Sequence, residues 1–240
     1  MSEQGTNERL QAFRIPSLPP DFYYIPDFIS AEEEASILQK IPSNRWTHLT
    51  HRRLQAHPST LTKSNTLLAA PLPTYLTSSI LPRFNALSIF DDTPHQAPNH
   101  VLINEYKPGE GIMPHEDGLA YAPVVATVSL GGSMVLDISA KADGHQENFE
   151  LPARIFQEPR SLLITTGSAY CDLMHGIAAV EVDEDLGAGS VANWGLLGDK
   201  EGIEGMSGRS VRATRVSLTF RDVMRVSKAA SKVLGGLGRR

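Results

Sequence analysis

The segment ATRVSLTFRDV, residues 213–223, decides how the second half of this 240-residue chain is expected to fold. Within it, Val216, Leu218 and Phe220 alternate with polar side chains. This alternation predicts a central β-strand with one apolar face packed on a core. The opposite face carries two arginines and two hydroxyls: Arg215, Ser217, Thr219 and Arg221. Since burying an arginine is costly without an anion, either an anion binds here or the strand is an edge strand with solvated arginines.

The same strand-like texture begins at residue 100. Short runs rich in β-branched residues, separated by Gly, Pro and Asp, predict further strands. They are HVLINEY (100–106), APVVATVSL (122–130), SMVLDIS (133–139), SLLITTG (161–167) and HGIAAVEV (175–182). Helix signals come earlier in the chain. The order of helices first and strands afterwards predicts an α+β, mainly β fold: an antiparallel barrel or sandwich with N-terminal helices on one side.

Two helices are expected in the first half of the chain. Ser30 and Glu33 form a capping box, which predicts that a helix begins there. Its buried stripe is expected to consist of four apolar residues: Ala35, Ile37, Leu38 and Ile41. A second helix is expected at about 74–88, where Pro82 predicts a kink or an early end.

The chain is expected to form one domain, residues 22–225, with a different segment at each end. Residues 1–21 end in a proline-rich run and predict an extended N-terminal arm. Residues 226–240 form a basic C-terminal tail. Within the domain, residues 183–210 open with an acidic run and hold seven glycines, which predicts a flexible insert.

Composition excludes several classes of protein. Hydrophobic residues make up 41% and charged residues 20% of the chain, as in ordinary globular proteins. No apolar run suits a membrane span or a signal peptide. The single cysteine excludes an internal disulfide and suits a reducing compartment, so we expect a cytoplasmic or nuclear protein. We also expect a monomer. The net charge of −5 gives no global attraction to nucleic acid, so such binding would need a local basic patch.

The segment NEYKPGEGIMPHEDG, residues 104–118, holds half of a possible metal site. In an extended chain, residues two apart share a face, so His115 and Asp117 converge while Glu116 points away. A distant histidine would complete a facial triad of two imidazoles and one carboxylate, which is typical of non-haem Fe(II) oxygenases. His175 is the best candidate, because it begins a strand-like run beside a glycine that allows close approach. The alternative is a polar loop whose histidine pairs with a neighbouring acid.

Two further polar side chains, Asn104 and Tyr106, share one face of the strand that precedes this turn. They are placed to donate hydrogen bonds to ligand oxygens, or else they form the polar edge of a partly buried strand. Together with Arg215, an arginine suited to bidentate capture of a carboxylate, they suggest a site for an acidic small molecule.

In this order, the motifs resemble those of the AlkB-like Fe(II)/2-oxoglutarate dioxygenases, most of all the subgroup called AlkB homologue six. The resemblance covers residues 100–223 and, more weakly, an N-terminal lead-in. Its motifs are N-x-Y (104–106), H-x-D (115–117), T-V-S-L (127–130), H-G-I (175–177) and R-V-S-L-T-F-R (215–221). The fold that it implies is a double-stranded β-helix, or jelly roll, flanked by helices.

The resemblance also implies roles for individual residues. It implies that His115, Asp117 and His175 ligate Fe(II) and act in catalysis with 2-oxoglutarate and O2. It implies that the 2-oxoglutarate subsite consists of Arg215, Asn104, Tyr106, Ser217 and Arg221. The 40 residues between His175 and Arg215 exceed the family's usual spacing, and the insert at 183–210, which could cover the site as a lid, accounts for the excess.

The substrate is the open question. The resemblance implies oxidative demethylation or hydroxylation of a nucleic acid, with single-stranded RNA or DNA easier to reach than a duplex. A local basic stretch at 44–58 holds Trp46, Arg52 and Arg53, which could stack on a base and contact phosphates. Alternatively, Trp46 anchors the core beside a solvated loop. A dioxygenase acting on a protein or small molecule, and a low-activity nucleic-acid-binding member of the fold, also remain open.

Overall fold

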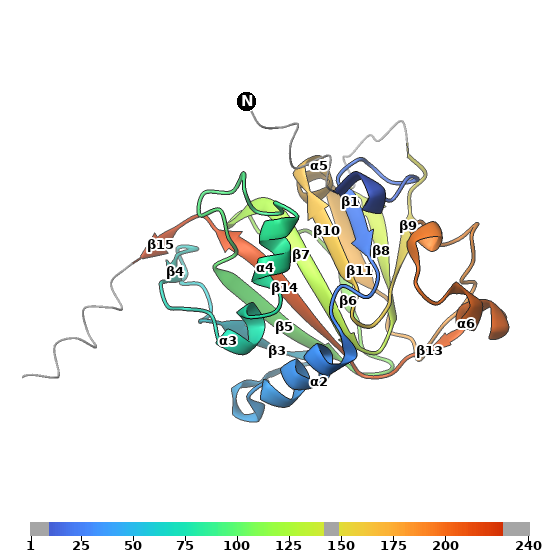
Figure 1. The fold of residues 1–240 in the computed structure, drawn as a ribbon, viewed down its shortest axis with the longest axis horizontal. Helices are drawn as coiled ribbons and strands as arrows, with labels where there is room; N and C mark the ends of the chain where they lie inside the picture. The colour runs from blue at the N-terminus through green and yellow to red at the C-terminus, as the bar shows by residue number, and fades with distance from the viewer. Residues whose placement is uncertain (1–9, 142–148, 228–240) are drawn as a thin grey trace, which may run out of the picture.

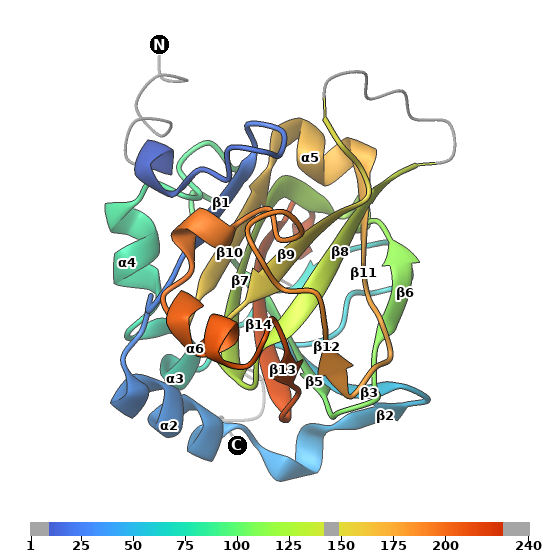
Figure 2. The same cartoon turned by 90° about the vertical axis from the view of Figure 1, so that its right-hand side faces the viewer.

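Two antiparallel sheets face each other in the computed structural model, which describes residues 10–141 and 149–227 (Figures 1 and 2). The larger sheet has seven strands in the order β1-β10-β7-β14-β5-β3-β2. Their bounds are β1 Phe22–Ile25, β2 Thr47–Leu49, β3 Arg52–His57, β5 His100–Tyr106, β7 Tyr121–Gly131, β10 Leu162–Thr166 and β14 Arg215–Val223. The first nine residues of the expected arm and positions 228–240 of the expected tail lie outside the described residues.

The smaller sheet has four strands in the order β6-β11-β8-β9. Their bounds are β6 Ile112–His115, β8 Met134–Ala140, β9 Ala153–Gln157 and β11 Leu173–Ile177. Two short ladders complete the strands: β12 Val182–Asp183 with β13 Ser210–Val211, and β4 Leu67–Leu68 with β15 Val226–Ser227. Two facing antiparallel sheets form the jelly roll that the sequence predicts, and the fold class is confirmed.

Strand β14 lies at the centre of the larger sheet, between β7 and β5. Its apolar side chains Val216, Leu218 and Phe220 are buried in a core cluster under the helices. Burial of three such side chains contributes roughly 1.5–3 kcal/mol each. The Phe220 ring meets Phe84 edge to face, with ring centroids 5.1 Å apart. The polar face of β14 is therefore turned the other way, towards the smaller sheet, and the alternative of a solvated edge strand is wrong.

Three helices cover the outer face of the larger sheet (Figure 1): α2 Ala31–Lys40, α3 Thr74–Thr77 and α4 Leu81–Ala86. The predicted capping box is present, since the Glu33 amide donates to Ser30 Oγ and the Ser30 amide donates to the Glu33 carboxylate. Pro82 lies at the start of α4, where its missing N–H costs nothing, so the second predicted helix is two short ones. The predicted stripe of α2 is partly wrong, because Ala35 is exposed. None of the helices in the described ranges is long and apolar enough to cross a bilayer.

Residues 10–21, the described part of the expected N-terminal arm, do not form the extended arm that the proline-rich run predicts. From residue 10 onwards this segment packs on the domain, with Leu10, Ile15 and Leu18 buried. It includes a short 3-10 turn, η1 Gln11–Phe13, and Arg14 forms a bridge with Tyr23 of β1. Its prolines alternate with large apolar residues, and those residues enter the core.

The insert at 183–210 is also folded, contrary to the expectation of a flexible loop. It holds a 3-10 turn, η3 Trp194–Leu196, and a helix, α6 Lys200–Gly205. Four apolar side chains are buried in the second core cluster: Leu186, Val191, Leu197 and Ile203. At its base, a buried ion pair joins Arg212 Nη2 to Asp183 Oδ1 at 2.6 Å. Its glycines permit tight turns, but the apolar residues between them fix its position.

The insert covers the outer edge of β9 (Figure 2). Asn193 is fully buried, and its side chain pairs with the backbone of Phe156 in β9: the Phe156 amide donates to Oδ1 at 2.9 Å, and Nδ2 donates to the Phe156 carbonyl at 2.8 Å. The Ala192 amide donates to the Arg154 carbonyl at 2.8 Å. These contacts replace a neighbouring strand, so the edge of the smaller sheet is not left open.

Candidate functional site

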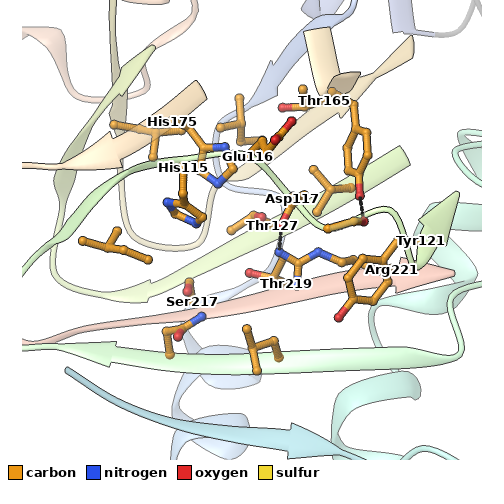
Figure 3. A pocket seen from close by; sticks show the side chains of 18 of the residues that line it. His115, Glu116, Asp117, Tyr121, Thr127, Thr165, His175, Ser217, Thr219 and Arg221 are labelled. Carbon is orange, nitrogen blue, oxygen red and sulfur yellow. Dashed lines mark hydrogen bonds and ion pairs between the residues drawn. The ribbon is translucent and has the colours of Figure 1, made fainter. Parts of the chain in front are cut away.

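A cavity of about 460 Å³ lies between the two sheets. Its walls come from both sheets, mainly β5, β7 and β14 on one side and β6, β8 and β11 on the other. Polar side chains of both sheets point into it (Figure 3). No lining residue belongs to the 183–210 insert, so the insert does not cover this cavity as the sequence suggested.

Two imidazoles face each other on the wall formed by the smaller sheet. His115 ends β6 and His175 lies in β11, where the two residues are directly paired across the strands. Their ring centroids are 4.4 Å apart (Figure 3). Gly176 makes this approach possible, because a Cβ on it would lie only 3.0 Å from the Pro114 nitrogen. The close approach expected of this glycine is confirmed.

The two imidazoles are prepared for metal ligation in different ways. His115 Nδ1 donates to the Met113 carbonyl oxygen at 2.9 Å, which leaves Nε2 as the ring nitrogen that could ligate a metal. Burial lowers the pKa of His175 from 6.5 to about 4, although the nearby Asp117 charge raises it. His175 is therefore neutral at neutral pH, the form in which histidine binds metals.

Asp117 lies just beyond the end of β6, and its carboxylate forms an ion pair with Arg221 of β14 (Figure 3). Both side chains are nearly buried, at 9% and 8% exposure. The Arg221 guanidinium also lies over the Tyr121 ring, 4.9 Å from its centroid. Glu116 also lines this cavity, but its carboxylate pairs with Lys141 and not with Arg221.

The three residues of the expected triad thus line one cavity, but the Asp117 carboxylate is paired with Arg221. Within residues 10–141 and 149–227, no three His, Cys, Asp or Glu side chains converge closely enough to hold an ion as they are arranged. The set still fits iron(II) in its chemistry: two imidazoles and one carboxylate, with the Asp117 charge acting on His175. Arg221 engages Oδ1 of Asp117, so an ion beside the imidazoles would share this carboxylate with the guanidinium.

Arg215 lines one end of the cavity, at the start of β14, and is only 2% exposed. Its Nη2 donates to Ser129 Oγ at 2.9 Å and to Gln157 Oε1 at 3.0 Å. Its Nε is buried without a partner, and no carboxylate of the described residues pairs with it. Burial accordingly lowers the pKa of Arg215 to about 10, still well above neutrality. A buried cation with an unused donor fits an acidic ligand such as 2-oxoglutarate.

Three other predicted residues surround this end of the cavity. Ser217 pairs with Asn104, and Arg215 with Tyr106, in the register of β14 and β5, so all four side chains line the same space. Burial raises the pKa of Tyr106, which keeps its hydroxyl protonated as a donor at neutral pH. Arg52 reaches the cavity from β3, and its Nε donates to Asn104 Oδ1 at 3.3 Å.

The other two tentative substrate residues do not line the cavity. Trp46 is partly buried against the core cluster under the helices. Arg53 stacks on the Trp46 ring, 4.4 Å from its centroid, and forms an ion pair with Glu105 at 2.7 Å. Since Arg52 and Arg53 are adjacent in a strand, they point to opposite faces of the sheet. The alternative of Trp46 as a core anchor agrees with this arrangement.

Several site residues had no role in the sequence reasoning. Ser129 stood in the T-V-S-L motif without an assigned contact, and Gln157 and Tyr170 carried no local signal. Gln157 reaches Arg215 across 58 positions of the chain, and the Tyr170 hydroxyl reaches the Gly118 carbonyl across 52. Only the packing of the two sheets brings these pairs together.

Comparisons with known proteins agree with this geometry. Residues 21–221 match the family model described as the 2OG-Fe(II) oxygenase superfamily. The Danio rerio protein "Probable RNA/DNA demethylase ALKBH6" is 38% identical over 229 residues, which cover 92% of this chain and 93% of that protein.

Two more distant matches extend the comparison. The Xenopus tropicalis protein "tRNA (carboxymethyluridine(34)-5-O)-methyltransferase alkbh8" is 30% identical, with 87% of this chain matching 32% of that protein. A solved structure titled "The structure of OsALKBH1" superposes with a TM-score of 0.54 at 15% identity, covering 85% of this chain and 99% of that one. The superposition supports the fold alone.

Proposed function

This chain belongs to the 2OG-Fe(II) oxygenase superfamily as an AlkB-like dioxygenase, and from that membership we propose that it demethylates or hydroxylates a nucleic acid at the cavity between its sheets. The family implies iron(II), 2-oxoglutarate and O2. The single observation that carries the proposal is a buried, carboxylate-free Arg215 in the same cavity as two facing imidazoles.

We assign iron(II) to His115, Asp117 and His175, and 2-oxoglutarate to the other end of the cavity. When bound, iron and 2-oxoglutarate would use O2 to hydroxylate a substrate C–H bond, one oxygen atom going to the substrate and the other to succinate as CO2 is released. Arg215 holds the far carboxylate of the diacid, and its burial makes that contact strong. Asn104, Tyr106 and Ser217 fix the orientation of the co-substrate.

Arg221 contacts the proposed iron ligand Asp117 and also lines the cavity proposed for 2-oxoglutarate. Its guanidinium keeps the Asp117 carboxylate in the cavity, and the stacked Tyr121 ring holds the guanidinium in place. The family resemblance assigns Arg221 to the 2-oxoglutarate subsite. In addition, we assign it the role of orienting Asp117. Water is excluded from this pair by its burial, which strengthens the interaction.

Binding of iron and co-substrate tests the assignment directly. Anaerobic addition of iron(II) and 2-oxoglutarate should produce a visible metal-to-ligand charge-transfer band, and admission of O2 should yield succinate. Zinc(II) in place of iron(II) is the control, because it cannot give the band. If the complete protein gives neither the band nor succinate above background, the proposed function is wrong.

A nucleic-acid substrate is supported by the similarity to the Danio rerio probable RNA/DNA demethylase and by Arg52 at the cavity. The guanidinium of Arg52 is held through Nε by Asn104, which leaves its Nη groups for an incoming phosphate. The net charge of −5 makes such a local contact necessary. Single-stranded substrate is favoured, because a base in a duplex must first be flipped at a cost of a few kcal/mol.

Adjacent arginines of β3 provide a matched pair of variants. Arg52→Ala should weaken binding of a single-stranded methylated oligonucleotide by about 1 kcal/mol, roughly five-fold, and lower the salt slope of binding by about one. Arg53→Ala should leave both unchanged, because Arg53 pairs with Glu105 on the opposite face. Fluorescence anisotropy at several salt concentrations measures both quantities. Equal losses from the two variants would contradict the use of the cavity by nucleic acid.

A further inference from the structure

The two imidazoles and the carboxylate of the expected triad are positioned by different contacts. His115 and His175 are fixed by the direct pairing of β6 with β11. That pairing ends at His115, so Asp117 lies in a loop without a paired strand. The loop makes few contacts: a Cβ on Gly118 would meet no atom within 4 Å, and Leu119 is 89% exposed. Besides the ion pair of Asp117 with Arg221, the backbone of this loop therefore needs its own anchor to hold the carboxylate near the imidazoles.

The anchor is Tyr170, a buried residue of the helix α5 Gly167–Asp172. Its hydroxyl donates to the Gly118 carbonyl oxygen at 3.0 Å, and its side chain is only 8% exposed. Because α5 runs directly into β11, this bond joins the Asp117 loop to the segment that carries His175. The bond acts on backbone one residue after Asp117, so it fixes the loop without occupying the carboxylate.

We propose that Tyr170 is a positioning residue that sets the distance between the Asp117 loop and β11, and thereby the affinity of the triad for iron(II). The proposal rests on the proposed function, in which His115, Asp117 and His175 hold the ion. A loop that is already ordered loses less conformational entropy when the ion binds. Outer residues that orient metal ligands typically contribute about 10–100-fold to metal affinity.

Two ion pairs of the loop cannot do this task. Arg221 binds the Asp117 carboxylate itself through Oδ1, so it orients a group that an ion must share and does not fix the backbone of the loop. Lys141 pairs with Glu116, but the carboxylate of that pair is 56% exposed. Exposed pairs contribute little to stability and are screened by salt. Tyr170 is the buried, uncharged contact, and it can persist unchanged when the ion is present.

Removal of one hydroxyl tests the proposal. Tyr170→Phe keeps the ring and deletes the donor. Tyr75→Phe is the matched control, since its buried hydroxyl has no hydrogen-bond partner among the described residues and lies outside the cavity. Cobalt(II) titration of the metal-free protein, followed by visible absorption, should show a Kd about ten-fold higher for Tyr170→Phe and unchanged for Tyr75→Phe. The KM for 2-oxoglutarate at saturating iron(II) should not change, because Arg215 is untouched.

A second measurement needs no metal. Amide hydrogen exchange of residues 116–120 in the metal-free protein should be faster in Tyr170→Phe than in the wild type and in Tyr75→Phe. Wild-type metal affinity in Tyr170→Phe, or unchanged exchange in the loop, overturns the proposal and leaves the proposed function intact. Absence of metal binding by the wild-type protein instead removes the proposed function, and this proposal with it.

Discussion

Arg215→Met should raise the KM for 2-oxoglutarate by at least about 30-fold. The guanidinium is fully buried and is placed to bind the far carboxylate of the diacid. Removing one partner of a buried, hydrogen-bonded charge pair costs roughly 2–5 kcal/mol, and 1.36 kcal/mol corresponds to a factor of ten. Steady-state succinate formation at varied 2-oxoglutarate measures the change.

The same substitution should leave the stability of the ligand-free protein nearly unchanged. The folded wild-type protein buries the Arg215 cation, which no carboxylate of the described residues neutralises. An apolar side chain of similar length therefore removes a desolvation cost. The loss of the hydrogen bonds to Ser129 and Gln157 offsets part of this gain. Arg83→Met is the control, because Arg83 pairs with Glu33 on the outer helices. A KM unchanged in Arg215→Met, or raised equally in Arg83→Met, would contradict the assignment.

Asp117→Ala should abolish turnover and also destabilise the metal-free protein. The substitution removes the anionic ligand and leaves the nearly buried Arg221 without its partner. Breaking a buried pair in this way costs roughly 3–5 kcal/mol. His115→Ala should abolish turnover to the same extent without that loss, since its Nδ1 bonds only to a local carbonyl. Succinate assays and urea unfolding of both metal-free variants measure the two effects.

This comparison separates ligation from support of the fold. Equal stabilities of the two variants would mean that the Asp117–Arg221 pair does not stabilise the ligand-free protein. Retained turnover in either variant would contradict the assignment of the triad itself.

Much of the fold followed from local patterns. The alternation in β14 was enough to separate its core face from its polar face, because the side-chain period of a strand is fixed. The capping box placed the start of α2, and the glycine beside His175 marked a close approach of two strands. In each case the signal and its cause lie within a few residues.

The failures have a common physical origin. The glycines at 183–210 predicted flexibility, but burial of Leu186 and Ile203 against the sheets outweighs backbone freedom. The basic stretch at 44–58 did not reveal that Arg52 and Arg53 point to opposite faces of β3. Composition gives the propensity of a segment, whereas its neighbours in space decide its conformation.

The side chain of Asn193 has a consequence for any attempt to shorten this protein. The Asn193 side chain occupies hydrogen-bonding groups of β9 that an adjacent strand would otherwise use. Excising residues 183–210 would therefore leave β9 as an unpaired edge strand of the smaller sheet. Such an edge pairs with extended segments of other molecules. A shortened enzyme would therefore be expected to self-associate before the deletion gave a substrate any freer access to the cavity. The glycine-rich segment thus prevents oligomerisation through the edge of the smaller sheet.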